Sequence, residues 1–284
     1  MGSDLKVVSG RMTMATDTPL ATVKLFGISL HQIRMSEAIG LLLRWMTDGS
    51  SCRYVVTPNV DHVVKLQTHL ALQAAYRDAA LVVADGWPLV AASRWLGQPL
   101  PERVAGSDLV PSLLAAGQAI PDFRVFLLGA APGVAEQAAQ RIQERWPGVN
   151  VCGVASPPPG FENEPDQCRA VVDDVNAESP HLLVVGLGAP RQEVWLRQYA
   201  PQLNARVAIA AGATIDFLAG VQTRAPVWIQ KLRLEWLFRL ATDPRRLAGR
   251  YAHDAIVFPR LIAAERRRLR TASLGQSRSR SRVL

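Results

Sequence analysis

The segment from His181 to Trp195, HLLVVGLGAPRQEVW, limits the possible folds of this chain more than any other feature. Its four apolar residues Leu182–Val185 are followed by Gly-Leu-Gly, and such a short, unbroken apolar run is typical of a strand buried on both faces. Pro190 then suits the first turn of a helix, where its missing N–H would have no partner in any case. A buried strand that leads directly into a helix is the basic unit of a parallel α/β sheet.

Glycine and polar residues lie where this strand is expected to end. Gly186 and Gly188 let the backbone approach a ligand closely, and Gln192 and Glu193 follow at the start of the helix. In open parallel sheets, ligands bind beyond the carboxyl ends of the strands. These four residues are therefore candidate substrate-binding residues.

The same alternation of short apolar runs and amphipathic segments continues along most of the chain. Strands are expected at Tyr54–Thr57, Leu81–Ala84, Val125–Leu128, Val149–Val154, Leu182–Val185 and Val207–Ala210. Helices are expected at about Val60–Arg77, Pro88–Leu96, from Ser107, at Val134–Trp146 and at Gln167–Ala177. This order predicts an α/β fold with a Rossmann-like, mostly parallel sheet flanked by helices.

Charge is distributed unevenly along the 284 residues. Residues 224–284 contain 15 Lys and Arg against 4 Asp and Glu, whereas residues 1–223 contain 17 against 20. A nearly neutral body therefore carries a C-terminal quarter with a net charge of +11. This asymmetry indicates an anionic partner, either a nucleic acid or a membrane surface.

The sequence divides into four parts. We expect a poorly ordered leader (1–21), an α/β domain (22–223), a basic amphipathic helical appendage (224–270) and a disordered, low-complexity tail (271–284). In the appendage, Trp228, Leu232, Trp236 and Leu240 are spaced four apart and would form one apolar stripe. This stripe could enter a membrane interface or pack on the core of the protein, and both hold if the appendage has two faces.

The sequence also indicates a compartment. No apolar run approaches the roughly 18–20 residues that a membrane-spanning helix needs, and the N-terminus lacks the apolar core of a signal peptide. The three cysteines form no CxxC pair and are expected to be small buried residues in a reducing environment. We therefore expect a cytoplasmic protein.

Further expected strand ends and the loops near them carry polar residues of the kinds that active sites use: Thr57, Asn59, Asp85 and Arg103. Thr57, Asn59 or Asp85 could instead cap a helix. A carboxylate in a partly apolar mouth, such as Asp85, can act as a general base. Arg103 could bind phosphate through two parallel hydrogen bonds, or it could pair with Glu102 or Asp108.

A glycine loop, Gly129–Gly133, separates another strand from its helix. It matches neither the Walker loop nor GxGxxG, but at a helix N-terminus Gly129 and its neighbours could receive the phosphates or ribose of a nucleotide. No Asp-x-Asp pair occurs, and the five histidines lack the spacing of metal ligands. We therefore expect a protein without a metal cofactor, in which arginines and helix N-termini bind phosphate.

Four motifs occur in order along the chain: TPNVDHVVKLQ, ADGWPLV with ERVAGSDL, VVGLGAPRQEVW, and GATIDFLAG with RAPVWIQKLRLEWLFRL. Together they resemble the WecG/TagA/CpsF family of bacterial glycosyltransferases, from about Val23 to Tyr251. The resemblance implies inverting transfer of a sugar from a UDP-sugar onto an undecaprenyl-diphosphate-linked acceptor, at the inner face of the membrane. It implies a role in cell-surface or exopolysaccharide synthesis, with N-acetylmannosamine, its uronic acid or glucose as the donated sugar.

The resemblance also implies roles for individual residues. The base of the family corresponds to Asp85, and its active-site threonine corresponds to Thr57. The family's arginine and glutamine correspond to Arg103 and Gln192. Asn59 would join Thr57 and Gln192 in orienting the sugars.

The appendage of the family, which reaches the membrane and closes over the site, corresponds to the segment from Arg224 onward. Its phosphate-contacting arginines best match Arg239 and Arg246, although Arg245 and Arg250 lie near the second of these. The resemblance therefore implies that the basic segment serves both catalysis and membrane docking.

Two other classes of protein fit parts of the sequence. A nicotinamide-dependent Rossmann enzyme would need GxGxxG after the first strand and an acid about 20 residues later, and this chain lacks that pair. A nucleic-acid-binding protein could use the arginine-rich tail, but here the basic residues are interleaved with a long apolar stripe rather than with isolated stacking aromatics. We therefore expect an anionic membrane surface, and no nucleic acid, as the partner.

Overall fold

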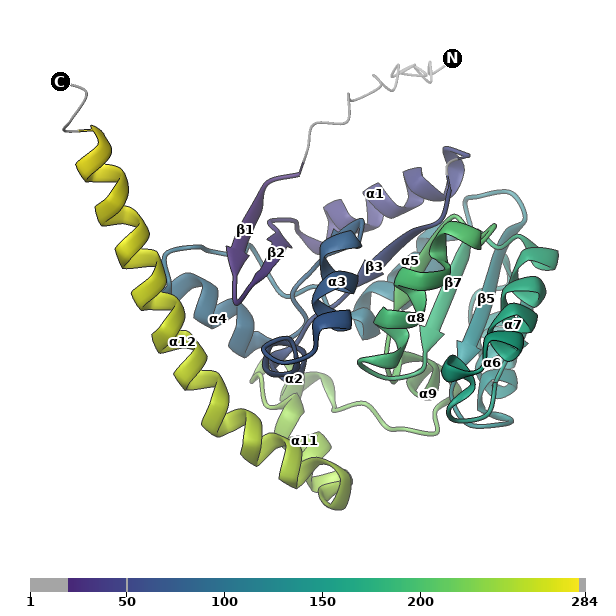
Figure 1. Ribbon diagram of the computed structural model, residues 1–284. Coiled ribbons are helices and arrows are strands. Elements are labelled where there is room, and N and C mark those ends of the chain that lie inside the picture. The colour runs from purple at the N-terminus through teal and green to yellow at the C-terminus, as the bar shows by residue number, and fades with distance from the viewer. Residues whose placement is uncertain (1–19, 50, 281–284) are drawn as a thin grey trace, which may run out of the picture.

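The computed structural model describes residues 20–49 and 51–280. Six parallel strands form its central sheet, in the order β4-β3-β8-β7-β5-β6 (Figure 1). Their bounds are β3 Arg53–Val56, β4 Leu81–Val82, β5 Phe123–Gly129, β6 Val149–Ala155, β7 Leu182–Gly186 and β8 Val207–Ala210. Each strand overlaps one that the sequence predicts, and the expected Rossmann-like α/β fold is confirmed.

The central strands are buried on both faces, which explains their continuous apolar sequences. In β7, Leu183 and Val185 face one hydrophobic core, and Leu182 and Val184 face another. The residues of β8 alternate in the same way. A strand with solvent on one face would instead alternate apolar with polar residues.

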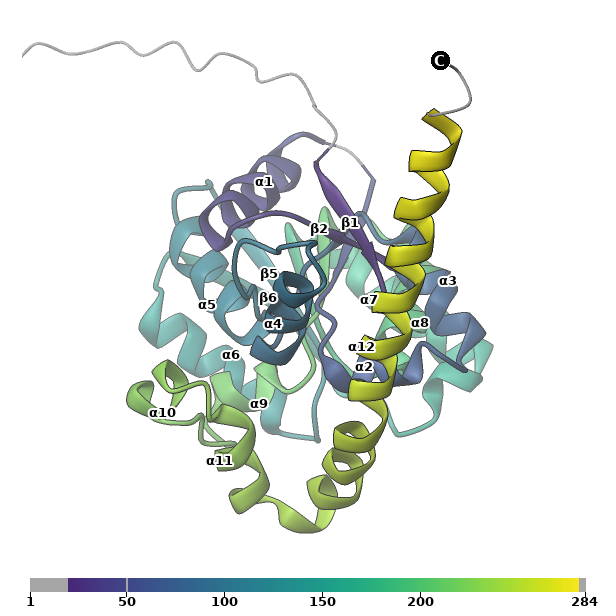
Figure 2. The same ribbon diagram turned by 90° about the vertical axis from the view of Figure 1, so that its left-hand side faces the viewer.

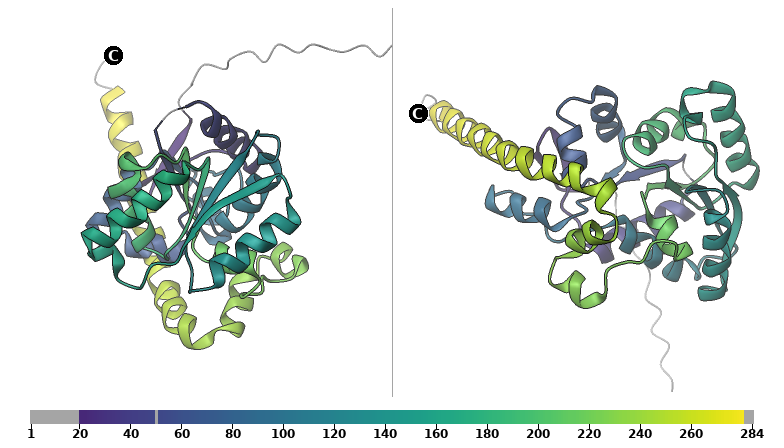
Figure 3. Two further views of the ribbon diagram at one scale, coloured as in Figure 1. Left: turned by 90° about the vertical axis from the view of Figure 1, so that its right-hand side faces the viewer. Right: turned by 90° about the horizontal axis from the view of Figure 1, so that it is seen from below.

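Helices cover both faces of the sheet (Figures 1 and 3). On one face lie α1 Met35–Thr47, α5 Gly106–Gly117, α6 Val134–Arg145 and α9 Thr214–Ala219. On the other lie α2 Val60–Lys65, α3 Leu70–Asp78, α4 Trp87–Trp95, α7 Pro165–Glu178 and α8 Arg191–Tyr199. Short 3₁₀ turns, η1 Phe161–Asn163 and η2 Ala200–Gln202, flank α7 and α8.

The single helix predicted over Val60–Arg77 is in fact two helices. The first, α2, ends after Lys65, and α3 begins at Leu70. His69 caps the second helix, because its ring Nδ1 accepts a hydrogen bond of 3.1 Å from the N–H of Leu72. The apolar pattern continues across this break, so periodicity alone did not reveal it.

A two-stranded antiparallel hairpin precedes the central sheet and was not predicted. It consists of β1 Thr22–Leu25 and β2 Ile28–His31, joined through Phe26 and Gly27 with φ angles of 53° and 85°. The ring of Phe26 lies 5.6 Å from that of Phe258, which belongs to the C-terminal helix. The hairpin therefore helps to hold that helix against the body.

The appendage contains three helices: α10 Val227–Lys231, α11 Glu235–Thr242 and α12 Pro244–Arg280. The single apolar stripe expected over Pro226–Leu240 is interrupted, because the backbone turns at Arg233, where φ is 62°. Figure 2 shows α10 and α11 below the sheet, and α12 returning upward past α2. The appendage thus covers the edge at which the parallel strands end.

The structure bears on the C-terminal end of the expected organisation but not on the N-terminal leader. The disordered tail is expected from Thr271, but α12 continues through Arg280. Extending an existing helix adds a hydrogen bond per residue without a new nucleus, so a low-complexity segment can prolong one. Residues 281–284 of the tail and residues 1–19 of the expected leader lie outside the described residues.

Candidate active site

A cavity of about 670 Å³ opens at the carboxyl edge of the sheet, and we call it the polar cavity. Loops that follow β3, β7 and β8 form its floor, and α9, α11 and α12 contribute its outer wall. Eight of the eleven candidate residues line it: Thr57, Asn59, Asp85, Gly186, Gly188, Gln192, Arg239 and Arg246. Residues that the sequence places at separate strand ends therefore lie together in one cavity.

Asp85 lies just beyond β4, where its backbone N–H donates to the carbonyl oxygen of Pro58 at 2.8 Å. It does not cap α4, whose N-cap is Gly86. Burial raises the pKa of the Asp85 carboxyl to about 6, although the guanidinium groups of Arg103 and Arg239 oppose that rise. A carboxylate whose pKa lies closer to neutrality is a better general base.

The two candidates after β3 also make local hydrogen bonds. Thr57 Oγ1 donates to the carbonyl oxygen of Ala210 at 3.4 Å and so joins the ends of β3 and β8. Asn59 Oδ1 accepts from the N–H of His62 at 3.2 Å and caps α2. The capping alternative is confirmed for Asn59, and it fixes the orientation of this amide at the cavity.

Gln192 joins two loops of the cavity floor, whereas its neighbour Glu193 lies behind that floor. The side-chain oxygen of Gln192 accepts from the N–H groups of Gly188 and Gly212, each at 3.2 Å. Its Nε2 donates to Glu193 Oε1 at 2.8 Å. Glu193 is fully buried and lines neither the polar cavity nor the two cavities described below, and its Oε1 lies 3.8 Å from His62 Nε2. This corrects the expectation that Glu193 contacts substrate, because adjacent helical residues point in different directions.

The glycines at the strand ends have different roles. Gly186 and Gly188 line the polar cavity, as expected, but Gly129 does not. The φ angle of Gly129 is 112°, and a Cβ there would lie 2.6 Å from the carbonyl oxygen of Gly186. Gly129 therefore permits the close approach of β5 and β7, and its contact with a nucleotide stays a prediction.

The appendage places three arginines in the polar cavity. Arg239 and Arg246 were predicted, and Arg250 joins them. Arg246 Nε lies 2.6 Å from Asp243 Oδ2, and Arg250 Nη1 lies 3.9 Å from Asp61 Oδ2. Guanidinium groups that converge on one cavity suit a phosphate-bearing ligand.

Arg103 lies at the boundary of the polar cavity rather than in its lining. Its Nη2 donates to Asp108 Oδ2, so the predicted alternative of an ion pair with Asp108, and not with Glu102, is confirmed. Its Nη1 lies 3.6 Å from both Asp85 Oδ1 and Glu235 Oε2. Arg103 therefore connects the candidate base to the appendage.

A second cavity, of about 390 Å³, adjoins the first, and we call it the apolar cavity. Its walls come from α2 and α4 of the body and from α11 and α12 of the appendage. Its apolar lining includes Trp87, Pro88, Trp236 and Phe258. Asp85 lines both cavities, so its carboxyl lies between two spaces of different chemistry.

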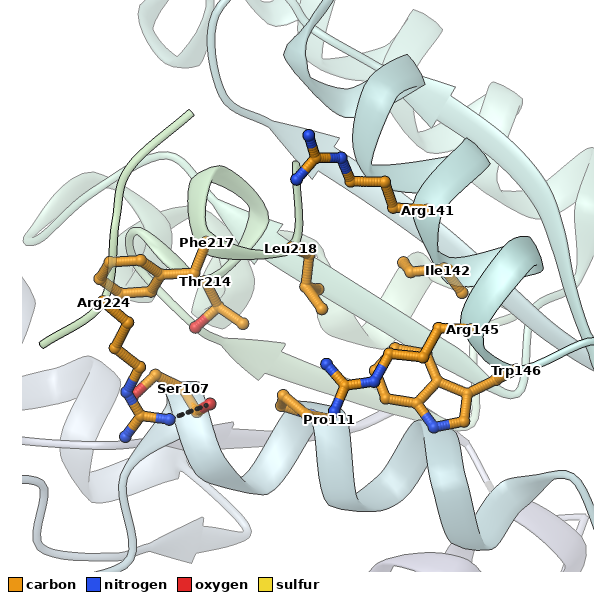
Figure 4. Close-up of a pocket in the computed structure, with 10 residues that line it drawn as sticks. All are labelled: Ser107, Pro111, Arg141, Ile142, Arg145, Trp146, Thr214, Phe217, Leu218 and Arg224. Carbon is orange, nitrogen blue, oxygen red and sulfur yellow. Dashed lines mark hydrogen bonds between the residues drawn. The ribbon is translucent and has the colours of Figure 1, made fainter. Parts of the chain in front are cut away.

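A third cavity, of about 340 Å³, is shown in Figure 4. Arg141 and Arg145 of α6 line one side of it, and Arg224 enters from the appendage. Arg224 Nη1 donates to the carbonyl oxygen of Ser107 at 3.3 Å, and the Arg145 guanidinium lies 4.6 Å from the centre of the Trp146 ring. None of the candidate residues lines this cavity.

Apolar side chains are exposed where α10 and α11 meet. Trp228 and Leu232 are 63% and 59% exposed, and Leu234 and Leu237 are exposed as well. We call these four residues the apolar tip. Trp236 is 49% exposed as well, but its ring centre lies 6.5 Å from that of Tyr251 and it lines the apolar cavity. The appendage thus has an outward apolar face and an inward one.

The part of the chain that the structure describes lacks two features. None of its helices is both long enough and apolar enough to cross a bilayer. Nor does it gather three or more His, Cys, Asp or Glu side chains in an arrangement suited to a metal ion.

A known protein family matches the same part of the chain that forms this architecture. The model of the glycosyl transferase WecG/TagA/CpsF family matches residues 23–272. The chain belongs to this family. Two Staphylococcus aureus proteins, from strains MRSA252 and NCTC 8325 / PS 47, are named N-acetylglucosaminyldiphosphoundecaprenol N-acetyl-beta-D-mannosaminyltransferase. Each is 29% identical to this chain over 257 residues, which is 90% of the chain and 98% of the relative.

Membership of the WecG/TagA/CpsF family confirms the predicted resemblance and makes the protein a glycosyltransferase. The nicotinamide-dependent alternative is thereby set aside. Charged residues that were not predicted from the sequence include Asp216, which lines the polar cavity, and Glu235, which lines the apolar cavity. Arg250, which the sequence named only as a neighbour of Arg246, follows that residue by four positions and shares its helix face. Asp216 lies within α9 and not directly at the end of β8, and Glu235 reaches the apolar cavity only because the appendage folds over the body.

Proposed function

We propose that this glycosyltransferase transfers a sugar, with inversion, from a UDP-sugar to an undecaprenyl-diphosphate-linked acceptor. The names of the Staphylococcus aureus relatives specify an N-acetylmannosaminyl group and an N-acetylglucosaminyl-diphosphoundecaprenol acceptor. N-Acetylmannosamine is therefore our first candidate for the donated sugar, and its uronic acid and glucose are the alternatives. Such a reaction serves cell-surface or exopolysaccharide synthesis.

One observation carries the mechanism: the Asp85 carboxyl lines both the polar and the apolar cavity. The polar cavity, with its arginines, suits a nucleotide diphosphate, and the adjoining apolar cavity suits the acceptor. Asp85 takes the proton of the acceptor hydroxyl as its oxygen attacks the anomeric carbon. The bond from that carbon to UDP breaks on the opposite face, so the configuration inverts.

The negative charge that develops on the departing UDP needs compensation. Arg239, Arg246 and Arg250 line the polar cavity and supply positive charge there. A divalent cation has this role in metal-dependent transferases, and we propose that the present enzyme works without one. Thr57, Asn59 and Gln192 orient the sugars through hydrogen bonds.

The acceptor is part of a lipid, so the enzyme must work at a membrane surface. We place the docking surface at the apolar tip, which projects from the basic appendage. Apolar side chains enter the interfacial region of a bilayer, and each nearby Lys or Arg adds about 1 kcal/mol of attraction to anionic lipid. We propose peripheral binding at the cytoplasmic face.

A donor panel tests this proposal directly. The purified protein is incubated with a short-chain prenyl-diphosphate-N-acetylglucosamine and with UDP-N-acetylmannosamine, its uronic acid or UDP-glucose, and released UDP is measured. We expect acceptor-dependent UDP release with one of these donors, and NMR of the product should show an inverted anomeric configuration. If every donor remained intact, the substrate assignment would be wrong, and a retained configuration would exclude the role of Asp85.

A further inference from the structure

Glu235 is the only acidic residue of α11, and three arginines surround its carboxylate. Its Oε2 lies 3.6 Å from Arg103 Nη1, and its Oε1 lies 3.7 Å from Arg224 Nε and 3.8 Å from Arg239 Nη2. The side chain is only 17% exposed, although α11 itself has no buried residue. Glu235 therefore points from an exposed helix into the body of the protein.

Asp108 closes this cluster from the opposite side. Its two carboxylate oxygens bind Arg103 Nη2 and Arg224 Nη2 separately, the second at 2.7 Å. Arg103 and Arg224 are thus bridged by Asp108 on one side and by Glu235 on the other. Since Arg103 and Asp108 belong to the body, whereas Arg224 and Glu235 belong to the appendage, this ring of charges fastens α11 to the body. Charges that are mostly withdrawn from water are poorly screened by salt.

Arg239 stands four residues after Glu235 and so lies on the same face of α11. It is one of the arginines that line both cavities. We propose that Glu235 is a positioning residue, which docks α11 on Arg103 and Arg224 and thereby holds Arg239 where it meets the diphosphate of the donor. This inference rests on the proposed function, because that function places the diphosphate in the polar cavity.

Glu235 also acts on Asp85 through its charge. Charged or titratable groups from several elements interact with Asp85: Arg103 from the loop before α5, Arg239 and Glu235 from α11, His62 from α2 and Tyr76 from α3. Burial is the main cause of the raised pKa of Asp85, and the negative charge of Glu235 adds to it. Removing that charge should therefore shift the acidic limb of the pH–rate profile to lower pH.

Binding of UDP tests the positioning role without requiring turnover. Glu235→Gln keeps the size of the side chain but removes its charge, and we expect it to weaken UDP binding in calorimetry by about twofold to 150-fold, the range of couplings between contacting groups. Arg239→Gln should weaken binding to a similar extent. In the double variant the combined loss should be smaller than the product of the two single losses, because Glu235 acts on UDP through Arg239.

A matched control comes from the same appendage. Glu265 is buried and pairs with Arg268 on α12, but it lines neither the polar nor the apolar cavity. Glu265→Gln should leave UDP binding as in the wild-type protein. A general loosening of the appendage would instead affect UDP binding in both variants and would expose the segment before α10 to limited proteolysis.

The possible outcomes separate this inference from the proposed function. Failure of the wild-type protein to bind UDP would overturn the proposed function and the inference with it. If the wild-type protein bound UDP and Glu235→Gln bound it equally well, the positioning role would be wrong while the proposed function stood. Multiplicative losses in the double variant would likewise show that Glu235 does not act through Arg239.

Discussion

Asp85 is the residue on which the proposed chemistry depends most. Replacing it with asparagine preserves its shape but removes the base, and this should lower kcat by about 10²- to 10⁴-fold. Because burial disfavours the charged carboxylate, the Asp85→Asn variant should melt at a Tm no lower than that of the wild type. Initial rates and a thermal melt measured together check both expectations. A variant with normal turnover would remove Asp85 from the mechanism.

The pH dependence of the reaction should report the same carboxyl. Since burial raises the pKa of Asp85 to about 6, the base is protonated below that pH and ionised above it. We expect kcat/KM to rise with pH through about 6 and then to level off, until another group titrates. Rates measured between pH 4.5 and 8 check this, with circular dichroism at each pH as the control for folding. A profile that stayed flat down to pH 5 would show that the pKa is not raised.

At the scale of single residues, the sequence was informative wherever a side chain follows a strand. Thr57, Asp85 and Gln192 could be placed together because the carboxyl ends of parallel strands share one edge of the sheet. The same rule failed for Glu193, which adjoins a cavity residue but turns into the core. It also gave no information on Glu235, because the contacts of that side chain depend on how α11 packs against the body.

At the scale of elements, the junction between β5 and β7 should be sensitive to a single methyl group. Gly129→Ala combines a φ of 112° with a Cβ only 2.6 Å from a carbonyl oxygen, and we expect it to lower the free energy of unfolding by about 3–5 kcal/mol. Gly133→Ala is the matched control, since it has a φ of 81° but nothing within 4 Å, and it should cost only about 1–2 kcal/mol. Urea denaturation of both variants measures the difference. Equal losses would show that the close approach to Gly186 is unimportant.

The apolar tip should determine membrane binding. A variant with Trp228, Leu232 and Leu234 all changed to serine should bind anionic vesicles at least about tenfold more weakly, because each apolar side chain adds roughly 1.5–3 kcal/mol when fully buried. Leu70→Ser is the control, since Leu70 is 77% exposed on α3, outside the appendage. Vesicle sedimentation at several salt concentrations provides the measurement. Unchanged vesicle binding, or equally strong binding to RNA, would contradict the assigned partner.

The strands of the central sheet could be predicted from the sequence better than the points at which helices break. Every strand of the central sheet was found from its apolar run, because burial on both faces leaves a strong sequence signal. The breaks at His69 and Arg233 were not found, because the apolar pattern continues through both. The β1–β2 hairpin was not found, because its strands alternate buried with more exposed residues and so contain no continuous apolar run.

At the scale of the whole molecule, chelation tests whether arginines alone supply the positive charge that the departing UDP needs. The appendage supplies arginines to the polar cavity, and we expect these to suffice for the charge on the leaving UDP. Turnover should therefore be unchanged in excess EDTA, whereas Arg246→Gln should lower kcat/KM for the donor. Loss of activity in EDTA that Mg²⁺ or Mn²⁺ restored would show that a metal ion is required.

The long helix α12 is part of the body as well as of the appendage. Phe258 is buried in a core that it shares with β1 and β2, and Arg268 Nη2 donates to the carbonyl oxygen of Lys24 at 3.1 Å. Arg266 lies 4.2 Å from the centre of the exposed Trp95 ring. A truncation before α10 would therefore uncover core residues as well as remove arginines, so point variants of the apolar tip test docking more cleanly.

The order of the strands has a consequence for the synthesis of this protein. The last strand to be made, β8, lies between β3 and β7, and the described sheet is joined across its middle only through β8. Until residues 207–210 have left the ribosome, β3 and β4 cannot pair with β5, β6 and β7. The edges of β3 and β7 therefore stay unpaired until β8, about 150 residues after β3, has been translated. Nascent chains that stall before this point should present two incomplete sheets to chaperones, and they would still lack every appendage residue of the site.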